Sequence, residues 1–225
     1  VINKQDNSPF SLADQEWLTA FTNQATIAIE NARLYTLTDQ ALAERVDELS
    51  VMQQIDRQLN ASLEVESALQ ITLDWALKQS HAEAGLVGTI DDHGFRLIVG
   101  RGYPQDHPGL KFPDQENPNG YYLDQPLIQS VLSSGKMQIV NDLDAQHSQT
   151  SGFLDGVCSQ VAIPVRRESQ IIGLIFLESQ NSRIFSTEKS SFLSRLSDHA
   201  AIALANAQLF AEIKDRYLER NGGYT

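Results

Sequence analysis

Two segments far apart in the chain repeat one pattern, and this repeat constrains the fold more than any other feature. The first runs from Phe10 to Tyr35 and the second from Phe185 to Phe210. Each opens on Phe-Ser and closes on Asn-Ala, any residue, Leu and an aromatic residue, which is more specific than two alanine-rich helices would share by chance. The interval between the copies exceeds that of solenoid repeats. We therefore expect a tandem array of whole domains, with residues 1–35 forming the C-terminal helix of a preceding domain.

Both copies are expected to be helices. Ser11 with Asp14 three residues later resembles a capping box, in which a hydroxyl and a carboxylate accept from free backbone N–H groups. In the second copy apolar residues recur in steps of three and four, interrupted only at Lys214, which predicts a seam for a partner helix. The seam consists of Leu193, Leu196, Ala200, Ala203, Ala207, Phe210 and Tyr217. Packing within one domain explains its first half, and a dimeric coiled coil is expected beyond Phe210.

No Gly or Pro lies between Pro9 and Gly85, which favours helix throughout this stretch. We expect a helical signalling linker over residues 36–62, a break near Ser62, and a further helix that Ser62 caps and that ends near His81. The linker stripe and the C-terminal seam together predict a homodimer. Its expected interface residues are Leu49, Met52, Ile55, Leu59, Ala200, Ala203, Ala207 and Phe210.

From Ala84 onward the pattern changes from helices to strands. The expected strands are residues 86–90, 95–99, 137–140, 157–166 and 170–179, with a hairpin turn at 91–94, a short helix at 127–132, and irregular loops at 102–120 and 141–156. This order predicts an α+β fold. A central antiparallel sheet carries the N- and C-terminal helices on one face and the long loops on the other.

Four segments carry a family resemblance: Ser159–Val165, Ile172–Ser179, Phe185–Glu188 and Ala201–Ala207, preceded by Gly135–Asp142. With them, residues 63–211 resemble a GAF domain, the small-molecule sensory module of cyclic-nucleotide phosphodiesterases, phytochromes and bacterial signalling proteins. The resemblance implies a PAS-like fold in a bacterial multidomain signalling protein. It also implies an output domain on the same polypeptide, such as a histidine kinase of a two-component system, with residues 212–225 beginning the next helical linker.

Charge and composition exclude several other classes of function. Seventeen Lys+Arg against 29 Asp+Glu give a net charge of −12, which disfavours nucleic acid and anionic lipid as partners. The longest apolar run, Ile171–Leu177, is too short to cross a bilayer. Residues Val1–Asp6 contain neither an initiator Met nor an apolar signal core, so we expect part of a longer or processed cytoplasmic chain. A single cysteine, Cys158, excludes disulfide frameworks and multi-thiolate metal sites within one chain.

The resemblance also bears on chemistry. Bilin-binding members attach their chromophore through a Cys upstream of the strand that begins at Val157, and the 141–156 loop contains none. Members that reduce free methionine sulfoxide depend on several cysteines, so no enzyme activity and no catalytic residue are expected. The cyclic-nucleotide signature is only partly present, because Phe185 is followed by one acid, Glu188, rather than a pair. The five histidines lack metal-ligand spacing, so no metal is expected, and no cofactor is identified.

Five residues lie in the loops or the strand that a GAF ligand faces. These candidate ligand-binding residues are Tyr103, Tyr122, Asp142, His147 and Glu178. Two functions remain open. One is a small-molecule receptor that transmits its signal through dimeric helices to the output domain. The other is a ligand-free structural domain that dimerises and spaces its neighbours.

Overall fold

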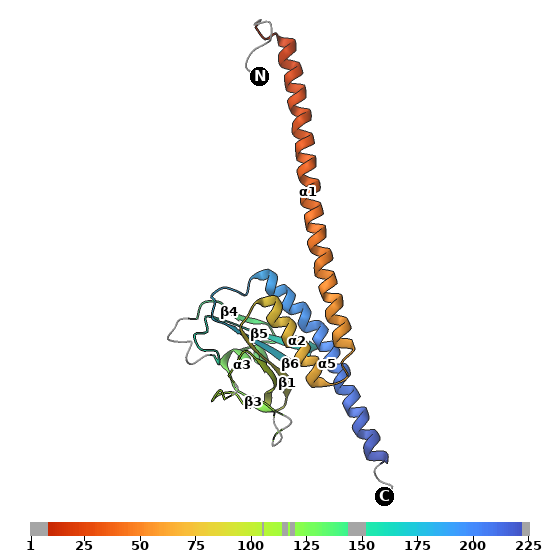
Figure 1. Ribbon diagram of the computed structural model, residues 1–225, viewed down its shortest axis with the longest axis vertical. Helices are drawn as coiled ribbons and strands as arrows, with labels where there is room; N and C mark the ends of the chain where they lie inside the picture. The colour runs from red at the N-terminus through yellow and green to blue at the C-terminus, as the bar shows by residue number, and fades with distance from the viewer. Residues whose placement is uncertain (1–8, 105, 114–116, 118–119, 144–151, 222–225) are drawn as a thin grey trace. The chain divides into compact units, whose positions relative to one another are not determined.

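The computed structural model describes residues 9–221 except 105, 114–116, 118–119 and 144–151 (Figure 1). The chain divides after Val51 into two units, which we describe separately. In the first, helix α1 (Leu12–Asn60) begins where the capping box predicts. The Asp14 carboxylate accepts from the Ser11 N–H at 2.8 Å, and the Asp14 N–H donates to Ser11 Oγ at 3.3 Å. The helix runs without a break across residues 35 and 36, where the predicted tail and linker meet.

The second unit is built on an antiparallel sheet. In the described part of the chain its strands are β1 (Ala84–Asp91), β2 (Gly94–Arg101), β3 (Tyr121–Leu123), β4 (Gln138–Val140), β5 (Ser159–Arg167) and β6 (Gln170–Ser179). Their order across the sheet is β3-β2-β1-β6-β5-β4. Every paired strand is antiparallel to its neighbour, so the predicted sheet is confirmed.

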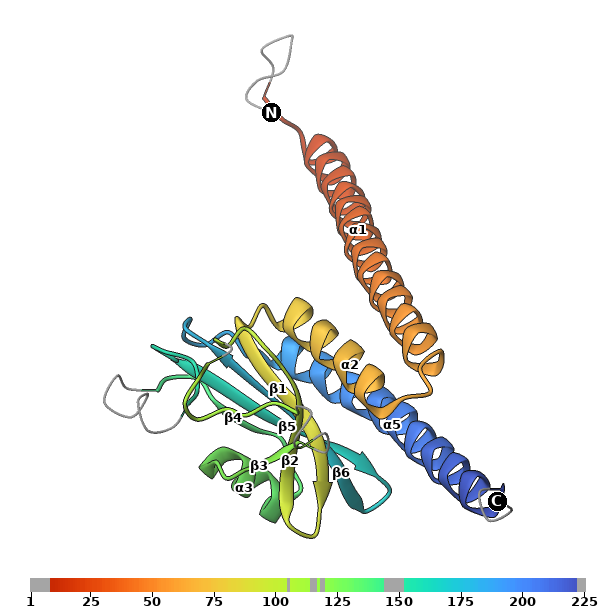
Figure 2. The ribbon, with the colours of Figure 1, turned by 60° about the horizontal axis from the view of Figure 1, so that its bottom comes forward.

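Three helices complete the described part of this unit. Helices α2 (Val65–Ser80) and α5 (Thr187–Asn221) pack against each other and on one face of the sheet (Figure 2). Helix α3 (Pro126–Ser134) lies on the opposite face with the loops, and Gly135 ends it in a left-handed conformation at φ 66°. The predicted α+β arrangement, with terminal helices on one face and loops on the other, is therefore confirmed. Among the described helices, none has both the length and the apolar character needed to cross a membrane.

Six of the eight residues predicted for a dimer interface are instead buried within a single chain, which corrects that prediction. Met52, Ile55, Leu59, Ala200, Ala203 and Ala207 are each no more than 9% exposed. The cause is that the last turns of α1 pack on the domain's own helices. Trp75 Nε1 on α2 donates to Gln58 Oε1 at 2.7 Å, and His199 on α5 pairs with Asp56. Leu49 and Phe210 remain 52% and 45% exposed.

Two local features differ from the sequence prediction. Ser62 does not cap α2: the N-cap position is Glu64, without a side-chain cap, and Ser62 Oγ donates to the Glu64 carbonyl at 3.1 Å. Strand β3 was not predicted, because three residues are too few to show an alternating pattern. It pairs with β2 and places Tyr122 opposite Arg96.

Candidate functional site

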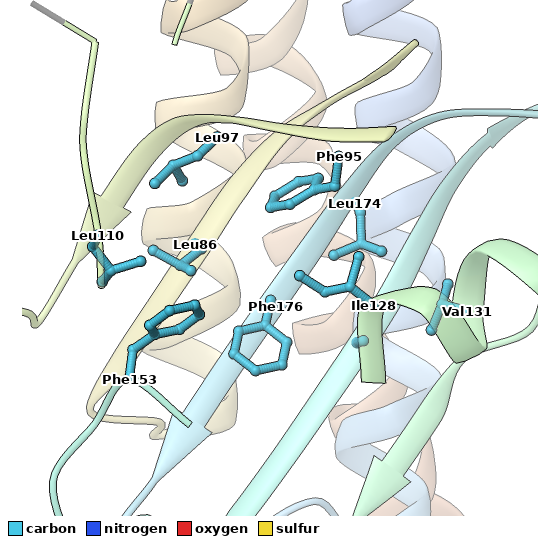
Figure 3. Close-up of a cluster of buried hydrophobic side chains, with 10 residues drawn as sticks. Leu86, Phe95, Leu97, Leu110, Ile128, Val131, Phe153, Leu174 and Phe176 are labelled. Carbon is cyan, nitrogen blue, oxygen red and sulfur yellow. The ribbon is translucent and has the colours of Figure 1, made fainter. Parts of the chain in front are cut away.

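The loop-bearing face of the sheet is covered by a cluster of buried apolar side chains (Figure 3). The cluster comprises Leu86, Phe95, Leu97, Leu110, Ile128, Val131, Phe153, Ala162, Leu174 and Phe176. They come from the strands, from α3 and from both long loops. The resemblance noted in the sequence places a ligand at this region as an expectation, and protein side chains fill it.

One carboxylate borders this apolar cluster. Because side chains alternate along a strand, Leu174, Phe176 and Glu178 of β6 point to the same face of the sheet. Glu178 is fully buried. Tyr103 Oη donates to Glu178 Oε2 at 2.8 Å, and Gln160 Nε2 on the neighbouring strand β5 donates to Oε1 at 2.8 Å.

Two backbone groups complete the hydrogen bonds of Glu178. The N–H of Phe153 donates at 3.1 Å to each carboxylate oxygen, and the N–H of Leu154 donates to Oε2 at 3.0 Å. Tyr103 lies on the loop after β2, whereas Phe153 and Leu154 lie on the loop before β5. A single buried side chain of the sheet therefore fastens both loops that cover the interior.

Burial and hydrogen bonding act in opposite directions on the pKa of Glu178, and burial has the larger effect. Burial raises the pKa of Glu178, while donated hydrogen bonds from Gln160, Tyr103, Phe153 and Leu154 oppose the rise. All four partners donate, and a carboxylate can only accept, so they stabilise the charged form. Burial and the neighbouring Glu178 charge raise the pKa of Tyr103 well above its ordinary value, which keeps its proton in place as a donor.

Aromatic rings from both loops surround the tyrosine. Tyr103 meets Phe153 edge to face, with centroids 6.3 Å apart and ring planes at 87°. His107 lies 5.9 Å from Phe153 and 6.4 Å from Tyr103, and Phe153 contacts Phe176 of the sheet at 6.4 Å. Such edge-to-face pairs stabilise one arrangement of the rings. They fix the loops over the interior in addition to the hydrogen bonds of Glu178.

Gly152 brings the second loop unusually close to the carboxylate. A Cβ atom added there would lie 2.5 Å from Glu178 Oε1 and 2.9 Å from Gln160 Nε2. Both distances are below any normal contact, so no larger residue fits without displacing these groups. The missing side chain is what allows the backbone donors of this loop to reach Glu178.

A hollow of about 660 Å³ lies beside Tyr103, between its loop and the segment from Leu110 to Pro113. Two cationic side chains line it, but each has a partner elsewhere. Arg101 lies 3.4 Å from the Asp74 carboxylate, and the Lys111 ammonium lies 5.7 Å from the centre of the Tyr121 ring. Tyr103 therefore lines an open hollow and also contacts a buried carboxylate.

The structure brings together two of the five predicted ligand-binding residues, Tyr103 and Glu178. Tyr122 is at the far edge of the sheet, where it donates to Asp91 Oδ2 at 2.7 Å. Asp142 is exposed and pairs with Arg183 at 2.9 Å. His147 lies outside the described residues.

Sequence reasoning missed Gln160 and the two backbone donors. Gln160 is a polar residue at the start of a strand that continues through Val161–Val165, and this interruption of an apolar pattern was the available signal. The N–H groups of Phe153 and Leu154 leave no trace in residue identity. Among the described residues, no group of three His, Cys, Asp or Glu side chains could hold a metal ion.

Comparisons with known proteins agree with this architecture. The family model described as GAF domain matches residues 62–205. The GAF domain of a phosphoenolpyruvate-protein phosphotransferase from Coxiella burnetii is similar, with a TM-score of 0.57 and 20% identity over 74% of this chain and 98% of that one. Its counterpart from Acinetobacter has a TM-score of 0.55 and 17% identity over 74% and 95%.

A third similar structure is the free methionine-R-sulfoxide reductase from Neisseria meningitidis in complex with its substrate. Its TM-score is 0.56, with 12% identity over 72% of this chain and 90% of that one. Identities this low show a shared fold alone. Among curated proteins, none matches the chain.

Proposed function

The chain belongs to the GAF domain family, and on that premise we propose that it is a sensory module whose ligand binds at Glu178, beneath the loops that carry Tyr103 and Phe153. A small molecule that supplies its own donors to the carboxylate replaces those of the loops. The bound and empty states then differ in how the loops are fastened. The buried contact between Glu178 and both loops is the observation that supports this function.

The strand that carries this carboxylate precedes the C-terminal helix α5. Strand β6 carries Glu178 and is followed by α5, and β5, which carries Gln160, packs against α5. A ligand that changes the Glu178 hydrogen bonds therefore favours one packing of sheet on helix over another. The size of this bias is limited by the difference in ligand affinity between the two states, typically about 1–3 kcal/mol.

We further propose that the signal passes through a homodimer formed by the outward face of α5 to an output domain such as a histidine kinase. This face exposes Ile202, Leu209 and Ile213, which are 60%, 54% and 58% exposed, and Asn206 lies between the first two. Their steps of four and three are those of a coiled-coil seam, in which one Asn selects the register. The first repeat copy exposes the same Ile-Asn-Leu pattern at Ile27, Asn31 and Leu34.

The repeat itself supports the proposal of a tandem array. Helices α1 and α5 begin at equivalent positions, and a serine caps both: Ser11 Oγ accepts from the Asp14 N–H at 3.3 Å, and Ser186 Oγ accepts from the Lys189 N–H at 3.4 Å. The face of α5 that packs on the sheet is buried at Leu196, whereas its counterpart Phe21 is 73% exposed. The sheet of a preceding GAF-like domain would cover that face.

The second candidate function is a ligand-free spacer, and one observation favours it. The interior is filled by side chains such as Phe95, Phe153 and Phe176, and protein donors already satisfy Glu178 (Figure 3). We assign no catalytic activity under either proposal. A thiol–disulfide cycle within one chain needs a second cysteine beside Cys158.

Mass spectrometry of small molecules released by denaturation separates the two functions. The sensory proposal expects a stoichiometric compound from the purified protein and much less from the Glu178→Gln variant. It also expects faster amide exchange at Phe153 and Leu154 when that compound is added back, because the donors of the ligand replace these two N–H groups at Glu178. If no compound is released and a metabolite extract leaves both amides unchanged, the spacer function replaces the sensory one.

A further inference from the structure

We infer that the Glu178 site takes a small organic cation that carries N–H donors. This inference rests on the proposed function and names the class of its ligand. The route to the carboxylate leads past Tyr103, from the hollow beside its loop.

The first reason is an unbalanced buried charge. Every described partner of Glu178 is neutral: a phenol, a side-chain amide and two backbone N–H groups. No Lys, Arg or His of the described residues forms an ion pair with it. A buried carboxylate without a counter-ion is costly, and a cation bound beside it supplies what the described part of the chain does not.

The second reason is the number and kind of hydrogen bonds at the carboxylate. Four donors from separate parts of the chain converge on its two oxygens, and two of these parts are loops. A primary ammonium carries three N–H donors and can replace the Tyr103 hydroxyl and a loop amide while adding a charge. A ligand that only accepts hydrogen bonds cannot make these contacts.

The third reason is the aromatic surroundings. Tyr103, His107, Phe153 and Phe176 lie in successive contact beside the carboxylate, and aromatic faces attract cations. An anionic group placed there meets a like charge at short range in a site with little water. Arg101 and Lys111 line the hollow beside Tyr103 and are engaged with Asp74 and Tyr121.

The test uses three compounds with the same carbon chain and different charge: n-butylammonium, 1-butanol and butyrate. Each is titrated into the protein while the amide signals of Phe153 and Leu154 are followed by NMR. We expect butylammonium to bind and shift both amides, with at least tenfold weaker binding of butanol and butyrate. The Glu178→Gln variant should bind butylammonium at least tenfold more weakly. The Asp142→Asn variant removes an exposed carboxylate and should bind it like the unmodified protein.

Each of the other outcomes contradicts a different part of the inference. If butanol or butyrate binds as tightly as butylammonium and shifts the two amides, the sensory site stands and its cationic ligand class is wrong. If Glu178→Gln binds butylammonium as tightly as the unmodified protein does, the cation binds at a site other than Glu178. If none of the three compounds binds, the ligand class is wrong, and the compound released by denaturation decides separately whether the sensory function stands. Should Glu178→Gln not fold, the two amide shifts in the unmodified protein decide the ligand class.

Discussion

The phenol of Tyr103 donates a 2.8 Å hydrogen bond to the carboxylate of Glu178, across 75 positions of the chain. One residue lies on a loop and the other on a central strand of the sheet. Glu178 is fully buried and Tyr103 is partly buried, so water competes little for this bond. The contact makes the position of the loop depend on the protonation and the partners of one side chain.

Removal of the Tyr103 hydroxyl should loosen that loop. We expect Tyr103→Phe to lower the free energy of unfolding by about 1–2 kcal/mol, because a buried acceptor loses a donor. Hydrogen exchange of residues 102–113 should accelerate. Tyr122→Phe is the matched control, since it deletes the same kind of bond to Asp91 at the exposed edge of the sheet and should change stability little. Equal losses of unfolding free energy in the two variants would show that burial does not strengthen the contribution of the Tyr103 hydrogen bond.

Addition of one methyl group at Gly152 should disturb the same site from the other loop. The new Cβ would lie 2.5 Å from Glu178 Oε1, so carboxylate or loop must shift, and we expect a loss of about 1–3 kcal/mol. Gly109→Ala is the control, because its nearest contact is the ring of His107 at 3.3 Å. Urea unfolding of both variants measures the difference. A Gly152→Ala protein as stable as Gly109→Ala would contradict the close approach.

Stability should depend on pH through Glu178 with a definite sign. Burial raises its folded pKa above the ordinary value of 4.5, so the folded state binds the proton more tightly than the unfolded state. The stabilisation is full below pH 4.5 and is lost as pH rises through the folded pKa. The unfolding free energy of the unmodified protein minus that of Glu178→Gln should therefore decrease with rising pH.

Asp91 provides a control of opposite sign. The hydrogen bond from Tyr122 lowers the pKa of Asp91, so its contribution is present above the ordinary carboxyl pKa and is lost as pH falls. The unfolding free energy of the unmodified protein minus that of Asp91→Asn should increase with rising pH. Urea titrations between pH 3 and pH 8 measure how both free-energy differences change with pH. Changes of the same sign would contradict the opposite pKa shifts of Glu178 and Asp91.

Substitutions at two neighbouring residues of α5 should affect either the stability of the fold or the assembly of the dimer. Ala203 is 1% exposed, so Ala203→Glu buries a charge and should cost about 3–5 kcal/mol of stability. Ile202 is 60% exposed on the outward face, so Ile202→Glu should leave the circular dichroism unchanged and shift the protein toward monomer in sedimentation. An unmodified protein that is monomeric at high micromolar concentration would remove the basis for the dimer.

The strands other than β3 could be predicted because Gly-containing turns or runs of β-branched residues mark them locally. The hairpin around Asp91 and the pair Ser159–Arg167 and Gln170–Ser179 illustrate this. The partner of the helical seam could not be predicted in the same way. A three-and-four spacing shows that Ala200 and Ala203 face something apolar, but it does not distinguish the domain's own sheet and helices from a second chain.

The site was predictable only where a side chain carries the chemistry. Tyr103 and Glu178 belong to segments that a GAF ligand faces, and the fold brings them together. The N–H groups of Phe153 and Leu154 exist in any sequence, so only the path of the loop past Gly152 reveals their role. Tyr122 and Asp142 meet other partners because their segments lie elsewhere in the domain.

The register of the two central strands determines how the domain responds to tension. Ala84, where β1 begins after α2, lies directly opposite Glu178, near the end of β6 before α5. Force that pulls α2 and α5 apart therefore reaches the sheet at the pair formed by Ala84 and Glu178. It separates β1 from β6 one residue pair at a time, instead of loading all the pairs together. The first residue pair to bear this force is the one that contains Glu178. Mechanical strain in the helices and occupancy of the carboxylate thus act on the same pair of residues.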